Sequence, residues 1–307
     1  MAQLSKILKY VTDPDYRFII DSNKGKYDAM PDNEYLKRRF KATLGYDLNL
    51  DNPQTFNEKI QWLKLYDRKP IYTSMVDKFE AKEYVSKIIG SEYIIPTYGI
   101  WDSFEDINFE SLPNQFVLKC THDSGGLVIV RDKANFDLKS AKKKVEKSLA
   151  RNYFNRSREW PYKNVKPRII VEKYMDDGHD GLRDYKFFNY NGKGMYVYVS
   201  EGLENHSTAK ISFYDLEGKQ MPFRRLDYKG FDDRIEFPEN FSKMKGVSEK
   251  LAQAINSPFV RTDFYSINGL IYFSEITFSP CSGMIPFFPS EWDMKLGELL
   301  ELPGGGN

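Results

Sequence analysis

The stretch from Val260 to Pro280, VRTDFYSINGLIYFSEITFSP, places two acids inside an otherwise apolar pattern. Two runs rich in β-branched and aromatic residues flank an Asn268-Gly269 pair, which is typical of the tight turn of a β-hairpin. The offsets from that turn bring Asp263 and Glu275 close to opposite one another on the two predicted strands. Because carboxylates are rarely buried unless they are paired or hold a metal, the pattern predicts a site at this hairpin.

A cation between these two carboxylates would remove their mutual repulsion. Oxygen ligands on a rigid sheet suit Mg²⁺, which completes its shell with phosphate oxygens and water. Thr277 points the same way as Glu275 and offers a third oxygen, while Arg261 shares a strand face with Asp263. The alternative is a hairpin whose acids simply face water, but both of its faces carry large apolar residues, which favours a buried Mg²⁺ site.

A second motif, FVLKCTHDSGGLVIV, runs from Phe116 to Val130 and reads as strand, small-residue loop and strand. Glycine permits positive φ at Gly125 and Gly126, so the backbone N–H groups from Ser124 to Gly126 are expected to converge on an anion, with Lys119 adding a charge. An ordinary glycine hairpin is an equally good interpretation of the loop alone.

The run IIVEKYM, from Ile169 to Met175, is a strand that ends in Glu-Lys-aromatic. Such an end offers backbone carbonyls and amides to an adenine edge, and Glu172 is placed to accept from the exocyclic amine. Taken alone the signal is weak, since Glu and Lys often end buried strands.

Composition restricts the class of protein. The 307 residues carry 45 Lys+Arg against 44 Asp+Glu, so no global field is available to collect nucleic acid or an anionic membrane. Two cysteines, Cys120 and Cys281, are too few for a disulfide framework or a zinc site. No apolar run reaches the roughly 18 residues of a membrane span, and the N-terminus has no secretory pattern. We expect a reduced, cytoplasmic protein without stable membrane insertion; its oligomeric state is open.

The order of predicted elements indicates a mixed α/β protein with at least two lobes. We expect helices through the first 75 residues, with a capping start at Asp32 and a capping box of Thr55 and Glu58, and then a helix over Val76–Gly90. The predicted strands are 92–101, 115–120, 126–132, 167–175, 184–193, 194–202 and 209–219, and the further helices are 138–154, 238–255 and 293–302. The four last residues, 304–307, read as a tail or linker.

The combination of lysine, glycine loop, Glu-Lys strand end and C-terminal Asp/Glu hairpin resembles the ATP-grasp superfamily, and within it most closely the TupA-like branch. The motifs that carry this likeness are VDKFEAKEYV, FVLKCTHDSGG, PRIIVEKYM, DYKFFNYNGK, VRTDFY, YFSEITFSPCSGM and DMKLGELLELP, between about Thr55 and Pro303. The resemblance implies an ATP-grasp fold, in which two α+β lobes enclose ATP. It assigns 76–303 to that domain, with a mobile lobe over about 117–171, and leaves residues 1–75 as a helical extension in place of the usual open-sheet domain.

The resemblance also implies roles for individual residues. Lys78 and Lys119 match the two phosphate-binding lysines, and Ser124, Gly125 and Gly126 match the loop over the phosphates. Glu172, Lys173 and Met175 match the adenine hinge, with Lys173 and Met175 acting through backbone, and Asp184 falls near the acid that holds the ribose. Asp263 and Glu275 match the Mg²⁺ carboxylates, with Thr277 where relatives have Asn, and Arg261 matches the arginine that stabilises an acyl phosphate. His122, Ser279, Ser282 and Gly283 are expected to contact substrate, although a loop-bracing role is as good an interpretation of His122.

The implied activity is that of an ATP- and Mg²⁺-dependent carboxylate–amine ligase acting through an acyl phosphate. Its implied substrates are a uronic acid of a cell-surface or capsular polysaccharide precursor and an amino acid or small amine. Two alternatives stay open: a sugar or polyol kinase that uses the same nucleotide site, and a non-enzymatic nucleotide-binding subunit of glycan assembly.

Overall fold

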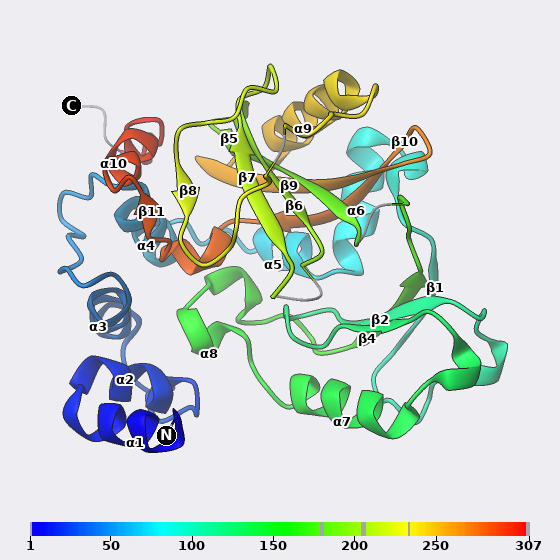
Figure 1. Cartoon of the computed structure of the whole chain (residues 1–307), viewed down its shortest axis with the longest axis horizontal. Helices are drawn as coiled ribbons and strands as arrows, with labels where there is room; N and C mark the ends of the chain where they lie inside the picture. Colours follow the sequence, from blue (N-terminus) through cyan, green and yellow to red (C-terminus); the bar gives the residue numbers. More distant parts are fainter. Residues whose placement is uncertain (1, 179–180, 204–206, 233, 305–307) are drawn as a thin grey trace.

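The computed structural model describes residues 2–178, 181–203, 207–232 and 234–304 (Figure 1). Of the predicted tail 304–307, only Gly304 lies within the described residues. The fold is mixed α+β, as predicted, and it is built around two antiparallel sheets with a helical region at the N-terminal end.

The smaller sheet has the strand order β1-β4-β2-β3. Its strands are β1 (Thr97–Trp101), β2 (Phe116–Cys120), β3 (Val128–Val130) and β4 (Ile169–Lys173). Helix α7 (Leu138–Leu149) packs Ala141 and Val145 against one face of it. The predicted lobe over 117–171 therefore lies inside a structural unit that also includes β1.

The larger sheet has the order β10-β9-β5-β6-β7. Its strands are β5 (Arg183–Tyr190), β6 (Lys193–Glu201), β7 (Lys210–Tyr214), β9 (Phe259–Ile267) and β10 (Leu270–Thr277). A short pair, β8 (Arg224–Arg225) with β11 (Phe287–Phe288), lies beside it. The predicted Asn268-Gly269 turn is present, with positive φ at both residues, and Asn191-Gly192 between β5 and β6 has the same conformation.

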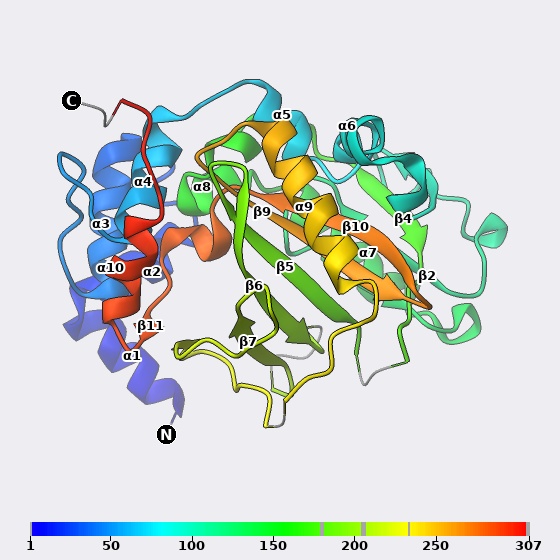
Figure 2. The same ribbon diagram turned by 90° about the horizontal axis from the view of Figure 1, so that it is seen from above.

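The two faces of the larger sheet have different covers. Helices α5 (Ile71–Val76), α6 (Glu80–Ile89) and α9 (Phe241–Ile255) bury one apolar face, and α9 crosses the sheet in Figure 2. On the other face, the half nearest α4 (Phe56–Tyr66) and α10 (Glu291–Glu298) is filled with aromatic rings, among them Phe188, Tyr196 and Phe213. The remaining half of that face is polar and carries the site described below.

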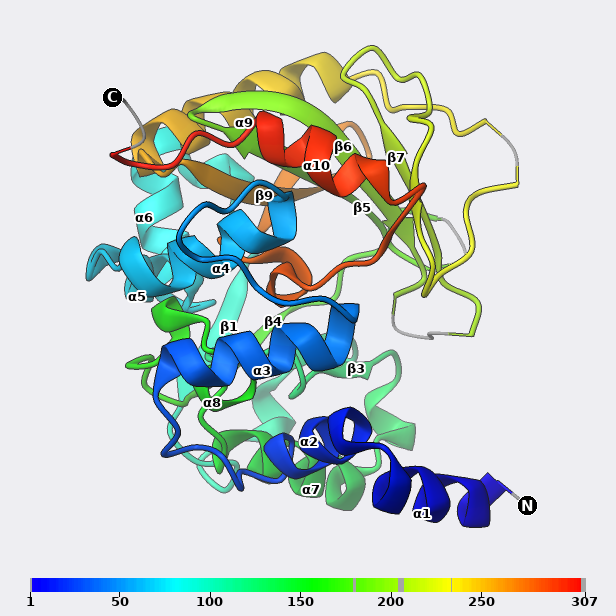
Figure 3. The same cartoon turned by 90° about the vertical axis from the view of Figure 1, so that its left-hand side faces the viewer.

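The N-terminal helices α1 (Ala2–Thr12), α2 (Pro14–Ser22) and α3 (Asp32–Leu44) lie on the opposite side of α4 from the sheet (Figure 3). Short helical segments α8 (Phe154–Ser157) and η4 (Trp160–Tyr162) connect α7 to β4. Asp32 is the first residue of α3 rather than its cap, because its carboxylate is bound by Arg68 and Arg158. The predicted capping box of Thr55 and Glu58 is present.

The helix predicted over Val76–Gly90 is interrupted. Helix α5 ends at Val76 and α6 begins at Glu80, because the Asp77 carboxylate accepts the N–H groups of Phe79 and Glu80 at 2.8 and 3.0 Å. The interruption places Lys78 in a turn, from which its amine reaches the carbonyl of Asp123.

Candidate functional site

A row of polar side chains crosses the larger sheet. Asp263 on β9 is the register partner of Glu275 on β10 and of Lys186 on β5, and Lys186 is the partner of Tyr198 on β6. Since residues at paired positions lie on one face, these groups from four strands converge. The predicted pair of acids is therefore brought together, and Lys186 joins it.

Arg261 binds both acids. Its guanidinium donates to Asp263 Oδ1 and Oδ2, each at 2.7 Å, to Glu275 Oε1 at 2.8 Å and to Thr277 Oγ1 at 3.0 Å. Asp263 is fully buried and also accepts from Lys186 Nζ at 2.7 Å. The arginine thus occupies the space between the two carboxylates, where the sequence predicts the metal.

Opposite charges set the ionisation of these groups. Burial favours the neutral form of Glu275, but Arg261, Lys186 and Lys78 outweigh it, so the pKa of Glu275 lies below its ordinary value. Burial likewise disfavours the Arg261 cation, yet Asp263, Glu275 and the Cys281 side chain raise its pKa.

Asp184 and Lys186 lie two residues apart on β5 and form a buried ion pair. Burial raises the pKa of Asp184 to about 6, against the opposing effect of Lys186. The family resemblance implies a ribose contact for Asp184, whereas no sequence motif singles out Lys186. Asp184 and Lys186 are two positions apart on one strand, so their side chains share a sheet face, and this spacing indicates that the lysine belongs to the site.

A cavity of about 880 Å³ opens between the two sheets. Ten of the predicted or newly found site residues line it: Lys78, Lys119, Ser124, Gly126, Glu172, Lys173, Met175, Asp184, Lys186 and Glu275. Gly125, Arg261, Asp263 and Thr277 are not part of its lining, because Asp263 and Thr277 are buried beneath it and Arg261 closes over them.

Glu172 lies at the end of β4 and bridges two lysines. Its Oε1 is 2.5 Å from Lys82 Nζ, and its Oε2 is 2.6 Å from Lys119 Nζ. The predicted contact to an adenine amine would therefore compete with two ion pairs. Lys82 is a site residue that the sequence analysis missed, although it follows Lys78 by four residues.

The loop from Ser124 to Gly126 departs from its expected conformation. Neither Gly125 nor Gly126 has positive φ, and the Gly126 N–H donates to Asp123 Oδ1 at 3.2 Å instead of pointing to an anion. Gly126 is needed for space, because a Cβ there would lie 2.5 Å from Cys120 Sγ. The expectation of three convergent amides was wrong in this respect. Ser124 still lines the cavity, and its hydroxyl bonds Tyr153 at 3.3 Å.

In the predicted adenine hinge, one backbone amide is already hydrogen-bonded within the protein. The N–H of Lys173 donates to the Pro96 carbonyl at 2.9 Å, so it cannot serve an adenine ring. Lys173, Tyr174 and Met175 nonetheless form one edge of the cavity.

His122 is a correction to the expected substrate contacts. It is buried, and its Nε2 lies 3.1 and 3.2 Å from the carbonyls of Ser148 and Arg151, at the end of α7. It therefore braces the loop. Ser279, Ser282 and Gly283 do follow the strand that carries Glu275, and the last two lie in the turn η5 (Pro280–Gly283). The Ser282 hydroxyl donates to Glu159 at 2.8 Å, a partner not anticipated from the sequence.

The family model of the TupA-like ATPgrasp proteins matches residues 58–301 of this chain. That match covers most of the sequence and begins inside α4. The chain belongs to the TupA-like ATP-grasp family. The suspected family is thereby confirmed, and α4 falls within the matched region although it was assigned to the helical extension.

The residues of this TupA-like protein fit the ligands that its family name implies. The cavity volume lies in the range of small-molecule sites, and two of its lining lysines, Lys78 and Lys119, supply positive charge for phosphates. Asp184 Oδ1 is buried without a hydrogen-bond partner among the described residues, which suits a ligand donor. Glu275 lines the cavity with oxygens of the type Mg²⁺ prefers, whereas the Asp263 oxygens accept from Arg261 and Lys186, so Mg²⁺ would have to displace one of these donors to reach them. Within the described ranges, no cluster of three or more His, Cys, Asp or Glu side chains is placed to hold a metal by itself, so phosphate oxygens would have to share the coordination.

Solved structures give weaker likenesses. D-alanine–D-alanine ligase from Helicobacter pylori is 14% identical with a TM-score of 0.47, and the match covers 82% of this chain and 70% of that enzyme. The ligase from Bacillus anthracis is 18% identical with a TM-score of 0.42, over 74% of this chain and 65% of that one. N5-carboxyaminoimidazole synthetase from Staphylococcus aureus is 15% identical with a TM-score of 0.39, over 66% and 44%. The chain thus spans just under two thirds of the Bacillus anthracis enzyme, and no curated protein matches it significantly.

Among the residues that the structure describes, none of the helices is both long enough and apolar enough to cross a bilayer.

Proposed function

We propose that this protein is an ATP- and Mg²⁺-dependent ligase that joins a carboxylate to an amine through an acyl phosphate. The observation that carries the proposal is the position of Glu275. Its side chain lines the cavity beside Lys186, while Arg261 ties it to the buried Asp263. Two cations, Arg261 and Lys186, surround the acids Asp184, Asp263 and Glu275 beside a cavity of small-molecule size, and such fixed charges suit the transfer of a phosphoryl group.

Each residue has a distinct task in this proposal. Lys119 and Lys78 attract the phosphates of the nucleotide, and Lys119 is held by Glu172 at the cavity wall. Asp263 and Glu275 present oxygens for Mg²⁺, and Arg261 spreads the negative charge that develops on the substrate. When bound, ATP supplies the phosphoryl group and Mg²⁺ neutralises its charge. The phosphoryl group gives the substrate carboxylate a leaving group, which an amine then displaces with release of phosphate.

The proposed substrates are a uronic acid of a cell-surface polysaccharide precursor and an amino acid or small amine. This choice rests on the family resemblance.

A coupled assay of ADP release against a panel of uronic acids, each with and without an amine pool, tests the proposal. We expect ADP only when both substrates are present, together with a product that has lost the carboxylate charge. ADP that needs no amine would indicate the sugar kinase instead. Tight ATP binding without turnover on any acid would favour the non-enzymatic subunit.

A further inference from the structure

Helix α4 carries a stripe of polar side chains that are completely withdrawn from solvent. Asn57, Gln61 and Lys64 are 0%, 0% and 3% exposed. The spacing of four and then three residues places all three on one helix face. Because buried polar groups must be paired, their partners identify what the stripe is for.

All three side chains bind the chain that follows the strand of Glu275. Lys64 Nζ donates to the Ser282 carbonyl at 2.5 Å, and Gln61 Nε2 donates to the Gly283 carbonyl at 2.5 Å. Asn57 binds both the carbonyl and the amide of Ile285, at 2.7 and 3.0 Å. The stripe therefore fixes the backbone from Ser282 to Ile285.

This backbone has an unusual conformation. Cys281, Ser282 and Gly283 have φ values of 48°, 61° and 61°, and the first two are not glycine. Such residues cost of order 1 kcal/mol or more each and persist only where the surroundings enforce them. A Cβ at Gly283 would lie 2.3 Å from Ile60 on the same helix, so the contact with α4 also demands glycine.

Lys64 makes a further connection, to the segment between α7 and β4. Its amine donates to the Ser157 carbonyl at 3.0 Å and to Gln61 Oε1 at 2.9 Å, so with Ser282 three acceptors use all three protons of the ammonium group. The neighbouring Glu159 carboxylate accepts from the hydroxyls of Ser157 and Ser282, at 2.9 and 2.8 Å. One buried amine thus joins α4, the small-lobe connection and the turn η5.

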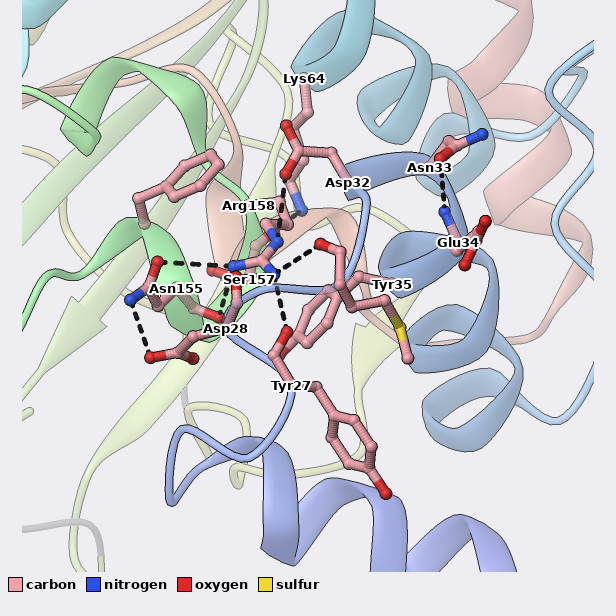
Figure 4. A network of polar contacts seen from close by, with 12 residues as sticks. Tyr27, Asp28, Asp32, Asn33, Glu34, Tyr35, Lys64, Asn155, Ser157 and Arg158 are labelled. Carbon is pink, nitrogen blue, oxygen red and sulfur yellow. Dashed lines mark hydrogen bonds and ion pairs between the residues drawn. The ribbon is translucent and has the colours of Figure 1, made fainter.

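The same connection is anchored from the other side. Arg158 is fully buried and donates to the carbonyls of Tyr27, Asp28 and Met30 at 2.9, 2.9 and 3.1 Å, and Figure 4 shows it beside Lys64 and Ser157. Its guanidinium also lies 4.3 Å from the ring centroid of Tyr35. The segment at Ser157–Glu159 is therefore held in place. Because Lys64 donates to both Ser157 and Ser282, it fixes η5 against this segment.

We propose that Lys64 is a positioning residue for the reaction: by holding the turn at Ser282 against Ser157, it fixes the η5 backbone that follows Thr277, whose hydroxyl accepts from Arg261 at 3.0 Å. The catalytic part of this inference rests on the proposed function, whereas the conformational part does not. It assigns α4 to the active site rather than to an N-terminal appendage.

The test uses the exposed thiol of Cys281 as a reporter of the turn. Cys120 is buried, so the disulfide reagent DTNB is expected to label Cys281 selectively, and Cys281→Ser should abolish the fast phase. In Lys64→Met the Ser282 carbonyl loses its shorter hydrogen bond and keeps only the one from Gln61 Nε2 at 3.1 Å. We expect the labelling rate to rise at least about threefold, with ATP affinity unchanged and turnover on the acid and amine reduced about tenfold or more.

Lys59→Met is the matched control. Lys59 lies on the same helix and also donates to two carbonyls, those of Gly297 and Leu300 at 2.9 and 2.8 Å, but it faces α10. We expect it to lower stability without changing the labelling rate. Ser282→Ala removes only the contact to Glu159 and serves as a second variant should Lys64→Met not fold.

The outcomes separate the two proposals. Unchanged Cys281 labelling in Lys64→Met and in Ser282→Ala, or an equal change in Lys59→Met, would overturn the positioning role. Faster labelling with no ADP release from the wild-type protein on any substrate would leave the turn assignment standing and count against the ligase.

Discussion

Glu275 on β10 faces Asp263 on β9 because β10 has a register irregularity at Ser274. With the two-residue turn at Asn268-Gly269, a regular ladder would place Ser274 opposite Asp263. The register shifts between Phe273 and Glu275, so that Glu275 takes that position, and Ser274 bonds the Tyr265 hydroxyl at 3.0 Å. Bulges of this kind re-aim side chains next to active sites.

Asp263→Asn is expected to reduce ADP release on the order of 100-fold, because the neutral amide cannot balance Mg²⁺ or hold Arg261 and Lys186 as ion pairs. The coupled ADP assay measures it, with circular dichroism to confirm folding. Asp227→Asn is the control, since Asp227 is a half-exposed acid paired with Arg225 on β8. Near-full activity of Asp263→Asn in excess Mg²⁺ would reject the metal assignment.

Lys119→Ala is expected to weaken ATP binding about tenfold or more, because a phosphate contact is lost. Adenosine binding should change less than about twofold, because Lys82 still pairs Glu172 after the Lys119–Glu172 ion pair is removed. Isothermal titration calorimetry with both ligands measures the difference. Lys142→Ala, which removes an exposed lysine paired with Glu105, should leave both affinities unchanged. Equal weakening of ATP and adenosine would make Lys119 a structural lysine.

Glu172→Gln is expected to alter the acid stability of the protein. Burial raises the pKa of Glu172, but Lys119 and Lys82 outweigh this and lower it to about 2 from an ordinary 4.5. A folded-state pKa below the unfolded one means that the ion pairs stabilise the fold fully above about pH 4.5 and lose that effect as the pH falls toward 2. At neutral pH the variant should be less stable by about 3 kcal/mol, because two buried lysines lose their partner.

Urea unfolding of Glu172→Gln and wild type from about pH 7 to about pH 3 measures this effect. The difference in unfolding free energy between wild type and Glu172→Gln should become smaller as the pH falls. A constant difference would show that the cost of the substitution is steric rather than electrostatic.

Gly126→Ala is expected to destabilise the fold by about 1–3 kcal/mol, because the new methyl group meets Cys120 and Ser148 at 2.5 and 2.9 Å. Gly125→Ala is a matched variant one residue away, where the nearest atom is the Asp123 carboxylate at 3.3 Å, and its effect should stay within about 0.5 kcal/mol. Chemical denaturation of both measures it. If the two variants lost the same unfolding free energy, the effect would come from the loop backbone and not from a clash with Cys120 and Ser148.

Hydrogen exchange with and without a non-hydrolysable ATP analogue tests the motion of the smaller unit. A lobe that closes over nucleotide should gain protection across Lys119–Val130 and around Glu172, while α2 and α3 change little. A uniform gain, or one confined to the N-terminal helices, would exclude a two-lobe grasp.

Local patterns predicted the elements of this fold well, and the site only in part. The Asn-Gly turn brought Glu275 to within one residue of the position opposite Asp263, because a hairpin is a local structure, and the irregularity at Ser274 completes the pairing. Lys186 was missed, since its meeting with Asp263 depends on the pairing of β5 with β9, whose residues lie 77 positions apart. His122 was misjudged because its partners belong to the end of α7, and the geometry of Gly126 depends on Cys120 and Ser148.

The stripe on α4 was hidden for a similar reason. Asn57, Gln61 and Lys64 are residue types usually found on a solvated helix face, and nothing local indicates that a turn from the far end of the chain covers them. The interruption at Asp77 has a local cause, because an Asp that accepts from the amides two and three residues on is a helix-start signal, and the continuous prediction over Val76–Gly90 overlooked it.

The contact of Asn57 with Ile285, 228 residues apart in sequence, has a consequence for biosynthesis. During translation α4 leaves the ribosome long before the turn that it holds in the folded protein. Its three polar side chains therefore stay hydrated until the residues that pair with them have been synthesised. Lys78 and Lys119, the proposed phosphate-binding lysines, emerge earlier than Arg261, Asp263 and Glu275. A nascent chain of this protein is therefore expected to stay inactive until its last strand and α10 have been released, and docking of that C-terminal segment onto α4 is then the step that completes the enzyme.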